Sequence, residues 1–196
     1  SLTILRKNIN SISDTIWINI ENKFLTNYSS QNILSYIKGT QYPDSFIVFT
    51  AHYDHLGMMG KDTYFPGAND NASGVAMLLN LAKHYSQNPP KCSVAFMAFG
   101  AEEAGLLGSK YYVEHPLFPL SKIKFLLNFD ILGTGDEGIK VVNGTEHKPE
   151  FDALVKINSE KTLLPSVQPR GKAAISDHHF FEEAGVKTLY IYTLGA

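Results

Sequence analysis

The amino-acid sequence predicts an α/β fold with a largely parallel sheet. Short apolar runs alternate with amphipathic stretches along the chain, which is the pattern that such folds produce. Two of the runs, Phe46–Ala51 and Ser93–Phe99, have the length of buried strands. Between them, Ser73–Tyr85 places its apolar residues at helical spacing. This order of a strand, a helix and a second strand is the unit from which parallel sheets are built.

Further elements of the first half follow from local patterns. Thr15–Ile20 alternates apolar and polar residues, which predicts a half-exposed edge strand. Gly39–Asp44 is rich in Gly, Pro and Asp, and we expect a turn there. Two prolines follow the helix predicted over residues 73–85, and they cannot continue it. We also expect a helix at Leu106–Glu114, which Pro116 ends in the same way.

The second half alternates in the same manner. We expect strands at Ile123–Phe129, Ile139–Val142 and Thr188–Thr193, and helices at Glu150–Ile157 and His178–Ala184. The stretch Thr162–Lys172 lacks clear periodicity and is predicted to be a loop. No internal repeat, low-complexity tract or linker interrupts the sequence. We therefore expect one domain over residues 1–196.

The composition excludes several classes of function. The chain has 196 residues, of which 44% are hydrophobic and 18% charged, as in an ordinary globular protein. The formal net charge of −2 gives no reason to expect a nucleic acid or a membrane surface as a partner. No apolar run has the length needed to span a bilayer. The single cysteine, Cys92, excludes an intramolecular disulfide and a thiolate-rich metal site.

Five clusters of polar residues lie at the ends of predicted strands or in the loops that follow them. Open α/β sheets bind ligands at this edge. The clusters are His52-Tyr-Asp54-His55, the Gly67–Gly74 stretch around Asp70, Glu102-Glu103, Asn128-Phe-Asp130 and Ser176-Asp177-His178-His179. Several of them also have an ordinary explanation, since Asp, Ser and Glu commonly cap or begin helices. Five such clusters together favour a shared site.

The residue types in these clusters are typical of a divalent metal site. Candidate ligands are two histidines and three acids: His52, Asp70, Asp130, His178 and one of the adjacent Glu102 and Glu103. Nitrogen and oxygen ligands without thiolate suit zinc, with manganese or cobalt as alternatives. Asp54 lies on the same side of its strand as His52 and can hold that ring in place. Ser73 is the better candidate to cap the following helix, which leaves Asp70 free to ligate.

In combination these segments resemble the M28 zinc aminopeptidases, the group of aminopeptidase Y and bacterial leucyl aminopeptidase. The matching segments are Ala51-His-Tyr-Asp-His-Leu-Gly57, Pro66-Gly-Ala-Asn-Asp-Asn-Ala-Ser-Gly-Val-Ala76, Phe99-Gly-Ala-Glu-Glu-Ala-Gly-Leu-Leu-Gly-Ser109, Asn128-Phe-Asp130 and Ser176-Asp-His178. They occur in the family's order and cover most of the chain. The resemblance implies a three-layer αβα sandwich around a central mixed, mostly parallel sheet, of the zinc exopeptidase, phosphorylase/hydrolase-like type.

The resemblance also implies a role for each residue. The implied ligands are His52 and Asp130 for one Zn²⁺, Glu103 and His178 for the other, and Asp70 as the bridge between them. Glu102 would be the general base for a water that the two ions activate, and Asp54 would orient His52. In this family the peptide bond after the bridging aspartate is usually cis, so we expect a cis bond between Asp70 and Asn71.

We therefore expect a zinc-dependent aminopeptidase that removes N-terminal residues from peptides or small proteins. Two alternatives stay open: a glutaminyl cyclase-like acyltransferase with one zinc, and a catalytically inactive binding domain on the same scaffold. His179 departs from the family, in which a His-x-Pro-Phe pattern is common. The chain also stops at Ala196, before a His-Thr-x-x-Asp-like segment, so we expect a single peptidase domain cut short at the C-terminus. The resemblance favours a secreted or periplasmic location.

Overall fold

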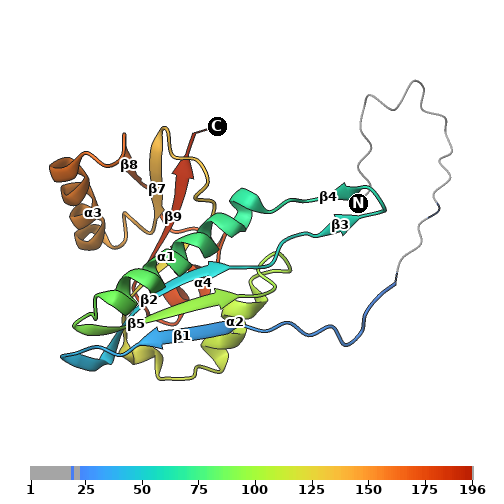
Figure 1. Ribbon diagram of the computed structural model, residues 1–196, viewed down its shortest axis with the longest axis horizontal. Helices are drawn as coiled ribbons and strands as arrows, with labels where there is room; N and C mark the ends of the chain where they lie inside the picture. Colours follow the sequence, from blue (N-terminus) through green and yellow to red (C-terminus); the bar gives the residue numbers. More distant parts are fainter. Residues whose placement is uncertain (1–18, 20–22, 196) are drawn as a thin grey trace.

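A seven-stranded sheet forms the centre of the computed structural model, which describes residue 19 and residues 23–195 (Figure 1). The strands are Ile33–Ile37 (β1), Tyr42–His52 (β2), Cys92–Phe99 (β5), Ile123–Phe129 (β6), Gly138–Val142 (β7), Val167–Pro169 (β8) and Thr188–Leu194 (β9), in the spatial order β1-β5-β2-β6-β9-β7-β8. β1 runs antiparallel to β5, and β7 antiparallel to β9. The other four neighbouring pairs are parallel. The sheet is thus mixed and mostly parallel, as the resemblance implies.

Helices cover both faces of this sheet and complete a three-layer sandwich. They are α1 (Ser73–Gln87), α2 (Leu107–Glu114), α3 (Lys148–Lys161) and α4 (His178–Glu183). On one face, Leu78 of α1 and Phe151 of α3 belong to the same buried cluster as Phe49 of β2. On the other face, Phe181 of α4 belongs to a second cluster with Val48. Because neighbouring residues of a strand point to opposite faces, β2 supplies side chains to both cores.

The structure differs from the sequence-based expectations mainly at the edges of the sheet. The predicted strand over residues 15–20 lies outside the described residues, apart from Asn19. The predicted turn Gly39–Asp44 overlaps β2, which already begins at Tyr42, and the predicted loop Thr162–Lys172 contains β8. β8 has three residues with little burial, and β1 is a largely exposed edge strand that was not predicted. β8 is too short to show an apolar pattern, and β1 is mostly apolar but lacks the strict alternation that marks a half-buried strand.

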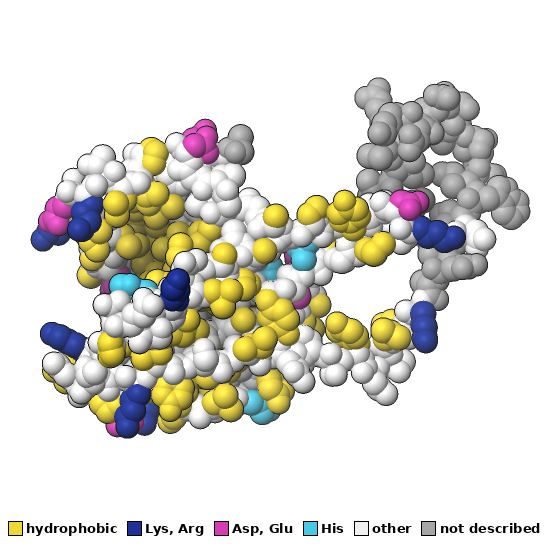
Figure 2. All heavy atoms as spheres, in the orientation of Figure 1, with side chains coloured by type: hydrophobic (Ala, Val, Ile, Leu, Met, Phe, Trp, Pro, Cys, Tyr) yellow, Lys and Arg dark blue, Asp and Glu magenta, His cyan; other side chains and the backbone are white. Residues whose placement is uncertain are grey.

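A small hairpin leaves the body of the molecule directly after the end of β2. Its strands are Met58–Met59 (β3) and Thr63–Tyr64 (β4), and it projects beyond the sheet (Figure 1). Histidine and acidic side chains gather where this hairpin joins the body (Figure 2). In the part of the chain that the structure describes, none of the helices is long and apolar enough to cross a membrane.

Candidate metal centre

The ends of β2 and β6 bring His52 and Asp130 together. The two strands are parallel, with Thr50 opposite Asn128, so the residues two positions further on meet at the same height. Nε2 of His52 lies 3.2 Å from Oδ1 of Asp130 and 3.1 Å from Oδ1 of Asp70. His52 and Asp130 are buried. Two carboxylates therefore converge on one imidazole nitrogen.

A chain of buried hydrogen bonds fixes the Asp130 carboxylate. The hydroxyl of Thr50 donates to Oδ1 of Asn128 at 2.6 Å, and Nδ2 of Asn128 donates to the hydroxyl of Ser176 at 2.8 Å. Ser176 in turn donates to Oδ2 of Asp130 at 2.7 Å. Its hydroxyl thus occupies one carboxylate oxygen and leaves Oδ1 facing His52. The sequence pattern around Ser176 indicates a capping role, and the hydrogen bond to Asp130 follows only from the fold.

Asp54 contacts His52 through a different atom from the one expected. Nδ1 of His52 donates to the backbone carbonyl of Asp54 at 3.1 Å, whereas the nearest carboxylate oxygen of Asp54 is 3.7 Å away. A carbonyl can only accept, so this contact places a proton on Nδ1 and directs Nε2 to the acids. The Asp54 carboxylate instead accepts the backbone N–H groups of Glu102 and Glu103, at 3.0 and 3.2 Å. One residue thus orients both the histidine and the turn that carries the glutamates.

Two groups of potential ligand atoms result from this arrangement. In one group, atoms of His52, Glu102 and Asp130 all lie within 4.8 Å of one another. In the other, atoms of His55, Asp70 and Glu103 do so. The groups adjoin, because Asp70 also contacts Nε2 of His52. His55, which the sequence analysis left without a role, lies with Nδ1 2.6 Å from Oε1 of Glu103.

The loop that carries Asp70 is tied to the end of β6. The peptide bond between Asp70 and Asn71 is cis, which confirms that expectation. Oδ1 of the buried Asn71 accepts the N–H groups of Gly74 and Ile131, at 3.0 and 3.2 Å, and its Nδ2 donates to the carbonyl of Phe129 at 3.0 Å. Asn71 therefore accepts a hydrogen bond from a backbone N–H group in the first turn of α1. The expectation that Ser73 caps this helix is wrong, because Ser73 is its first residue and donates to the carbonyl of Asn69.

The structure does not bring His178 to the other predicted ligands. Its Nε2 donates to the carbonyl of Ala173 at 2.9 Å, and its Nδ1 has no hydrogen-bond partner among the described residues. Burial lowers the pKa of His178 to about 4, so the ring is neutral near pH 7. His178 is the first residue of α4, and the ring is buried close to the ring of Tyr190. It belongs to neither group of potential ligand atoms.

The electrostatics of the centre favour a bound cation. Burial, together with the charges of Asp177, Asp130 and Glu103, raises the pKa of Glu102 to about 8. Burial and the neighbouring charge of Asp130 likewise raise the pKa of Asp70. Burial opposes the charged form of His52, but the hydrogen bond and charge of Asp130 outweigh it and raise its pKa to about 10. Carboxylates crowded in this way are relieved by a positive charge.

The distances around His52 also fit zinc. Zinc bonds to nitrogen and oxygen are about 2.0–2.1 Å long, so two ligand atoms of a tetrahedral ion are about 3.3 Å apart. The separations from Nε2 of His52 to Asp70 and Asp130 are 3.1 and 3.2 Å. The donor atoms are nitrogen and oxygen alone, as in many zinc hydrolases. His52, Asp70 and Asp130 therefore fit this metal.

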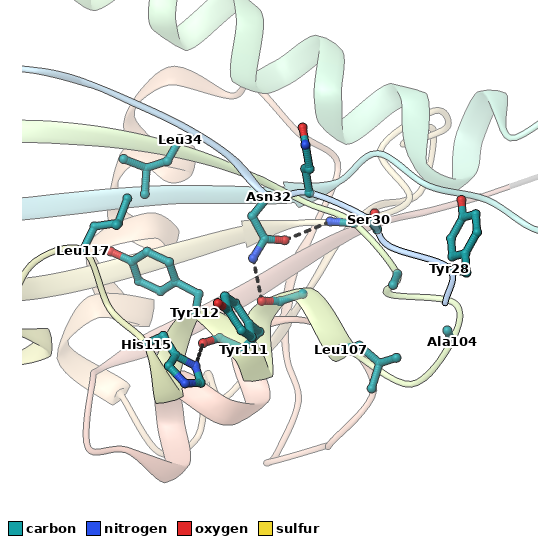
Figure 3. A pocket seen from close by; sticks show the side chains of 14 residues that line it. Tyr28, Ser30, Asn32, Leu34, Ala104, Leu107, Tyr111, Tyr112, His115 and Leu117 are labelled. Atoms are coloured by element: carbon teal, nitrogen blue, oxygen red, sulfur yellow. Dashed lines mark hydrogen bonds between the residues drawn. The ribbon is translucent and has the colours of Figure 1, made fainter. Parts of the chain in front are cut away.

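Two cavities open beside the centre. The smaller one, of about 260 Å³, is lined by Asp54, His55 and Glu103 among others. The larger one, of about 640 Å³, lies between β1 and α2 and contains none of the predicted ligands in its lining. Figure 3 shows Asn32 among the side chains that line it; Nδ2 of Asn32 donates to the carbonyl of Gly108 at 2.8 Å, and its Oδ1 accepts the N–H of Gly100 at 3.2 Å. The cavities share four lining residues, Tyr28, Ser30, Ala101 and Ala104, and are thus contiguous.

The chain is similar in sequence and in fold to known zinc aminopeptidases. Aminopeptidase YwaD of Bacillus subtilis (strain 168) is 34% identical over 175 residues, which is 84% of this chain and 36% of that protein. A solved structure of BSAP, a zinc aminopeptidase from Bacillus subtilis, superimposes with a TM-score of 0.72 and 32% identity over 85% of this chain and 40% of that one. The chain thus spans little more than a third of the length of these relatives.

A second enzyme class shares the fold. A glutaminyl cyclase from Bacteroides thetaiotaomicron superimposes with a TM-score of 0.65 and 24% identity, over 82% of this chain and 63% of that one. At this level of identity the likeness shows the fold alone. Residues 32–195, by contrast, match the family described as peptidase family M28, in which zinc aminopeptidases occur. The chain belongs to peptidase family M28.

Proposed function

We propose that this chain is the catalytic domain of an aminopeptidase that uses two zinc ions to hydrolyse the N-terminal peptide bond of peptides. The observation that carries the proposal is the convergence of Asp70 and Asp130 on Nε2 of His52, at 3.1 and 3.2 Å. Membership of a family that contains zinc aminopeptidases supports it. The carboxylates of Asp70 and Glu103, which belong to the adjoining group of potential ligand atoms, support a second ion beside the first.

The proposed ligands divide between the two ions. His52 and Asp130 would hold the first and Glu103 the second, and Asp70 would be shared between them because it contacts both groups. We leave His178 out of this set, since its Nε2 is committed to the carbonyl of Ala173. When bound, the ions supply Lewis acidity, which lowers the pKa of water and polarises a carbonyl group.

Glu102 is the proposed general base. It lies in the same group as His52 and Asp130, next to the position of the first ion, and is only partly buried. The backbone N–H of Glu102 donates to Oδ1 of Asp54. This hydrogen bond fixes the main chain of the turn that carries the Glu102 carboxylate. In this role Glu102 accepts a proton from water and then delivers it to the leaving amine. Glu102 has a raised pKa without metal, and a cation beside it would lower that pKa, so that the carboxylate could accept the proton.

Substitution of Glu102 tests this role. Glu102→Ala should retain zinc but lose turnover by about 10²–10⁴-fold, because the metal ligands stay in place while proton transfer is lost. Zinc content is measured by elemental analysis, and turnover with a panel of free and N-acetylated aminoacyl substrates. Glu114→Ala, which alters an exposed glutamate of α2, is the matched control. Near-normal turnover in Glu102→Ala would refute the assignment.

The same measurements separate the alternatives. Two zinc equivalents and cleavage of only the free aminoacyl substrates support the aminopeptidase. One equivalent, together with cyclisation of an N-terminal glutamine, would identify the cyclase instead. A protein that takes up no zinc and turns over neither substrate would be a binding domain on this scaffold.

A further inference from the structure

His55 is the residue beside the centre to which the proposed function gives no role. Its Nδ1 is 2.6 Å from Oε1 of Glu103, and the two side chains are only 21% and 22% exposed. Both residues belong, with Asp70, to the second group of potential ligand atoms. Two roles fit this position. His55 either ligates the ion that Glu103 holds, or donates a hydrogen bond that fixes the Glu103 carboxylate.

The distance between the two side chains separates these roles. Two ligand atoms of one tetrahedral zinc ion are about 3.3 Å apart, and the contacts of His52 with Asp70 and Asp130 come close to this value. The 2.6 Å between Nδ1 of His55 and Oε1 of Glu103 is too short for these two atoms to ligate one ion together. It is instead the length of a strong charge-assisted hydrogen bond. The carboxylate oxygen accepts this hydrogen bond, and Nδ1 of His55 donates it.

The surrounding loop confines the imidazole ring to this position. Gly67, whose φ of +67° lies in the left-handed region, packs its backbone against the ring. A Cβ atom on Gly67 would lie 3.1 Å from Cδ2 and Cγ of His55. Phe65 meets the ring edge-on, with 6.4 Å between the centroids. Because the loop limits the rotamers of His55, the direction of Nδ1 is set before any ion binds.

Glu103 is held from its other end as well. Its backbone N–H donates to Oδ2 of Asp54 at 3.2 Å, which fixes the main chain of the turn. With Oε1 engaged by His55, the second oxygen and the remaining lone pair are left for a cation. The donated hydrogen bond also offsets the repulsion between the carboxylates of Glu103 and Asp70, which face each other in this group.

We propose that His55 is a positioning residue, which donates its Nδ1 proton to Glu103 and holds that carboxylate in place for the second zinc ion. The inference rests on the proposed function, because it presupposes that Glu103 binds a zinc ion. Outer hydrogen bonds of this kind orient ligands, and their loss weakens metal binding by about 10–100-fold. The expected effect is confined to the second ion, since His52 and Asp130 have their own partners.

The test compares zinc binding by the purified wild-type protein, His55→Ala and His55→Asn. Asn places an amide N–H donor near the position of Nδ1, yet it cannot replace an imidazole as a nitrogen ligand. We expect His55→Ala to bind the second zinc ion about 10–100-fold more weakly, with the first unchanged, and His55→Asn to recover most of the affinity. Titration against a chelating indicator gives both constants. His84→Ala, which alters an exposed histidine of α1, is the matched control.

Each other outcome overturns the inference in a recognisable way. Unchanged binding in His55→Ala would assign the ring to packing alone, and equal loss in His55→Ala and His55→Asn would make His55 a ligand. A wild-type protein that binds fewer than two ions would overturn the proposed function, and this inference with it. Nitrogen-15 NMR of wild-type His55 in the zinc-loaded protein needs no variant. It should show a proton on Nδ1 and no bond from the ring to metal.

Discussion

At the scale of single residues, the centre depends on the side chains that hold the proposed ligands in place as much as on those ligands themselves. Asp130 offers one oxygen to His52 because Ser176 occupies the other, and Ser176 is oriented by Asn128 and Thr50. All three partners are fully buried, so each hydrogen bond forms without competition from water. Sequence patterns identify acids and histidines readily. They do not reveal this chain of hydrogen bonds, because its residues are distant in the sequence and only the fold brings them together.

Removal of the Ser176 hydroxyl tests this chain of hydrogen bonds. Ser176→Ala should weaken binding of the first zinc ion by about 10–100-fold, because the Asp130 carboxylate gains freedom to rotate. Chelator competition measures this affinity. Ser93→Ala is the matched control, since Ser93 is equally buried and bonds Gly39 and Pro43 far from the centre. Equal zinc affinity in Ser176→Ala and the wild type would show that Asp130 is held by other contacts.

The protonation of His52 makes zinc uptake dependent on pH. Burial disfavours the charged form of His52, but Asp130 raises its pKa to about 10. Without zinc, the ring is therefore protonated on both nitrogens and positively charged at neutral pH. A ligating Nε2 must lose that proton. Zinc affinity should therefore rise with pH between about 6 and 8, by about tenfold per unit for each proton displaced. Calorimetry at pH 7 in buffers of different ionisation enthalpy should detect proton release, and its absence would contradict the prediction.

At the scale of elements, sequence patterns predicted the buried structure and missed the exposed parts. The predicted strand Ile123–Phe129 is confirmed residue for residue, and the predicted helix over residues 73–85 corresponds to α1. Both bury a clear apolar pattern, whereas β8 and the β3–β4 hairpin do not. The position of His178 could not be predicted either, because a sequence does not state which side of a short helix its first residue faces.

The loop before α1 shows how one side chain joins two elements. Asn71 binds Gly74 at the start of α1, and Phe129 and Ile131 at the end of β6. Gly74 permits this close approach, since a Cβ there would lie 2.5 Å from the carbonyl oxygen of Phe129. The loop that carries Asp70 is therefore locked to the strand that leads to Asp130.

Asn71→Ala should loosen this junction. It leaves buried backbone groups without partners, so the free energy of unfolding should fall by on the order of 1–3 kcal/mol. Affinity for zinc should fall as well, because Asp70 precedes Asn71 directly. Urea denaturation and chelator competition measure the two effects. Asn80→Ala, on the exposed side of α1, is the control, and a comparable effect there would contradict the prediction.

At the scale of the whole molecule, the topology decides which residues meet. β5, β2 and β6 lie side by side and run parallel, so their carboxyl ends share one edge of the sheet. His52, the turn with Glu102 and Glu103, and Asp130 all follow these ends, although up to 78 positions separate them in the sequence. This convergence was predictable, because the motifs that contain His52, Glu102-Glu103 and Asp130 each lie at or just after the end of a strand.

The convergence of these residues at one edge of the sheet concentrates negative charge there, in a protein whose formal net charge is only −2. Asp70, Glu102, Glu103 and Asp130 lie in two adjoining groups with two histidines, so bound zinc should stabilise the whole fold.

At a free zinc concentration of 100 times Kd, each ion adds about 2.7 kcal/mol to the free energy of unfolding. For a domain of this size, removing one ion should lower Tm by about 5–10 °C. Differential scanning calorimetry with and without a chelator measures the shift. In Asp70→Ala, which lacks the shared carboxylate, the chelator should have little further effect; an equal shift in both proteins would show that zinc stabilises the fold elsewhere.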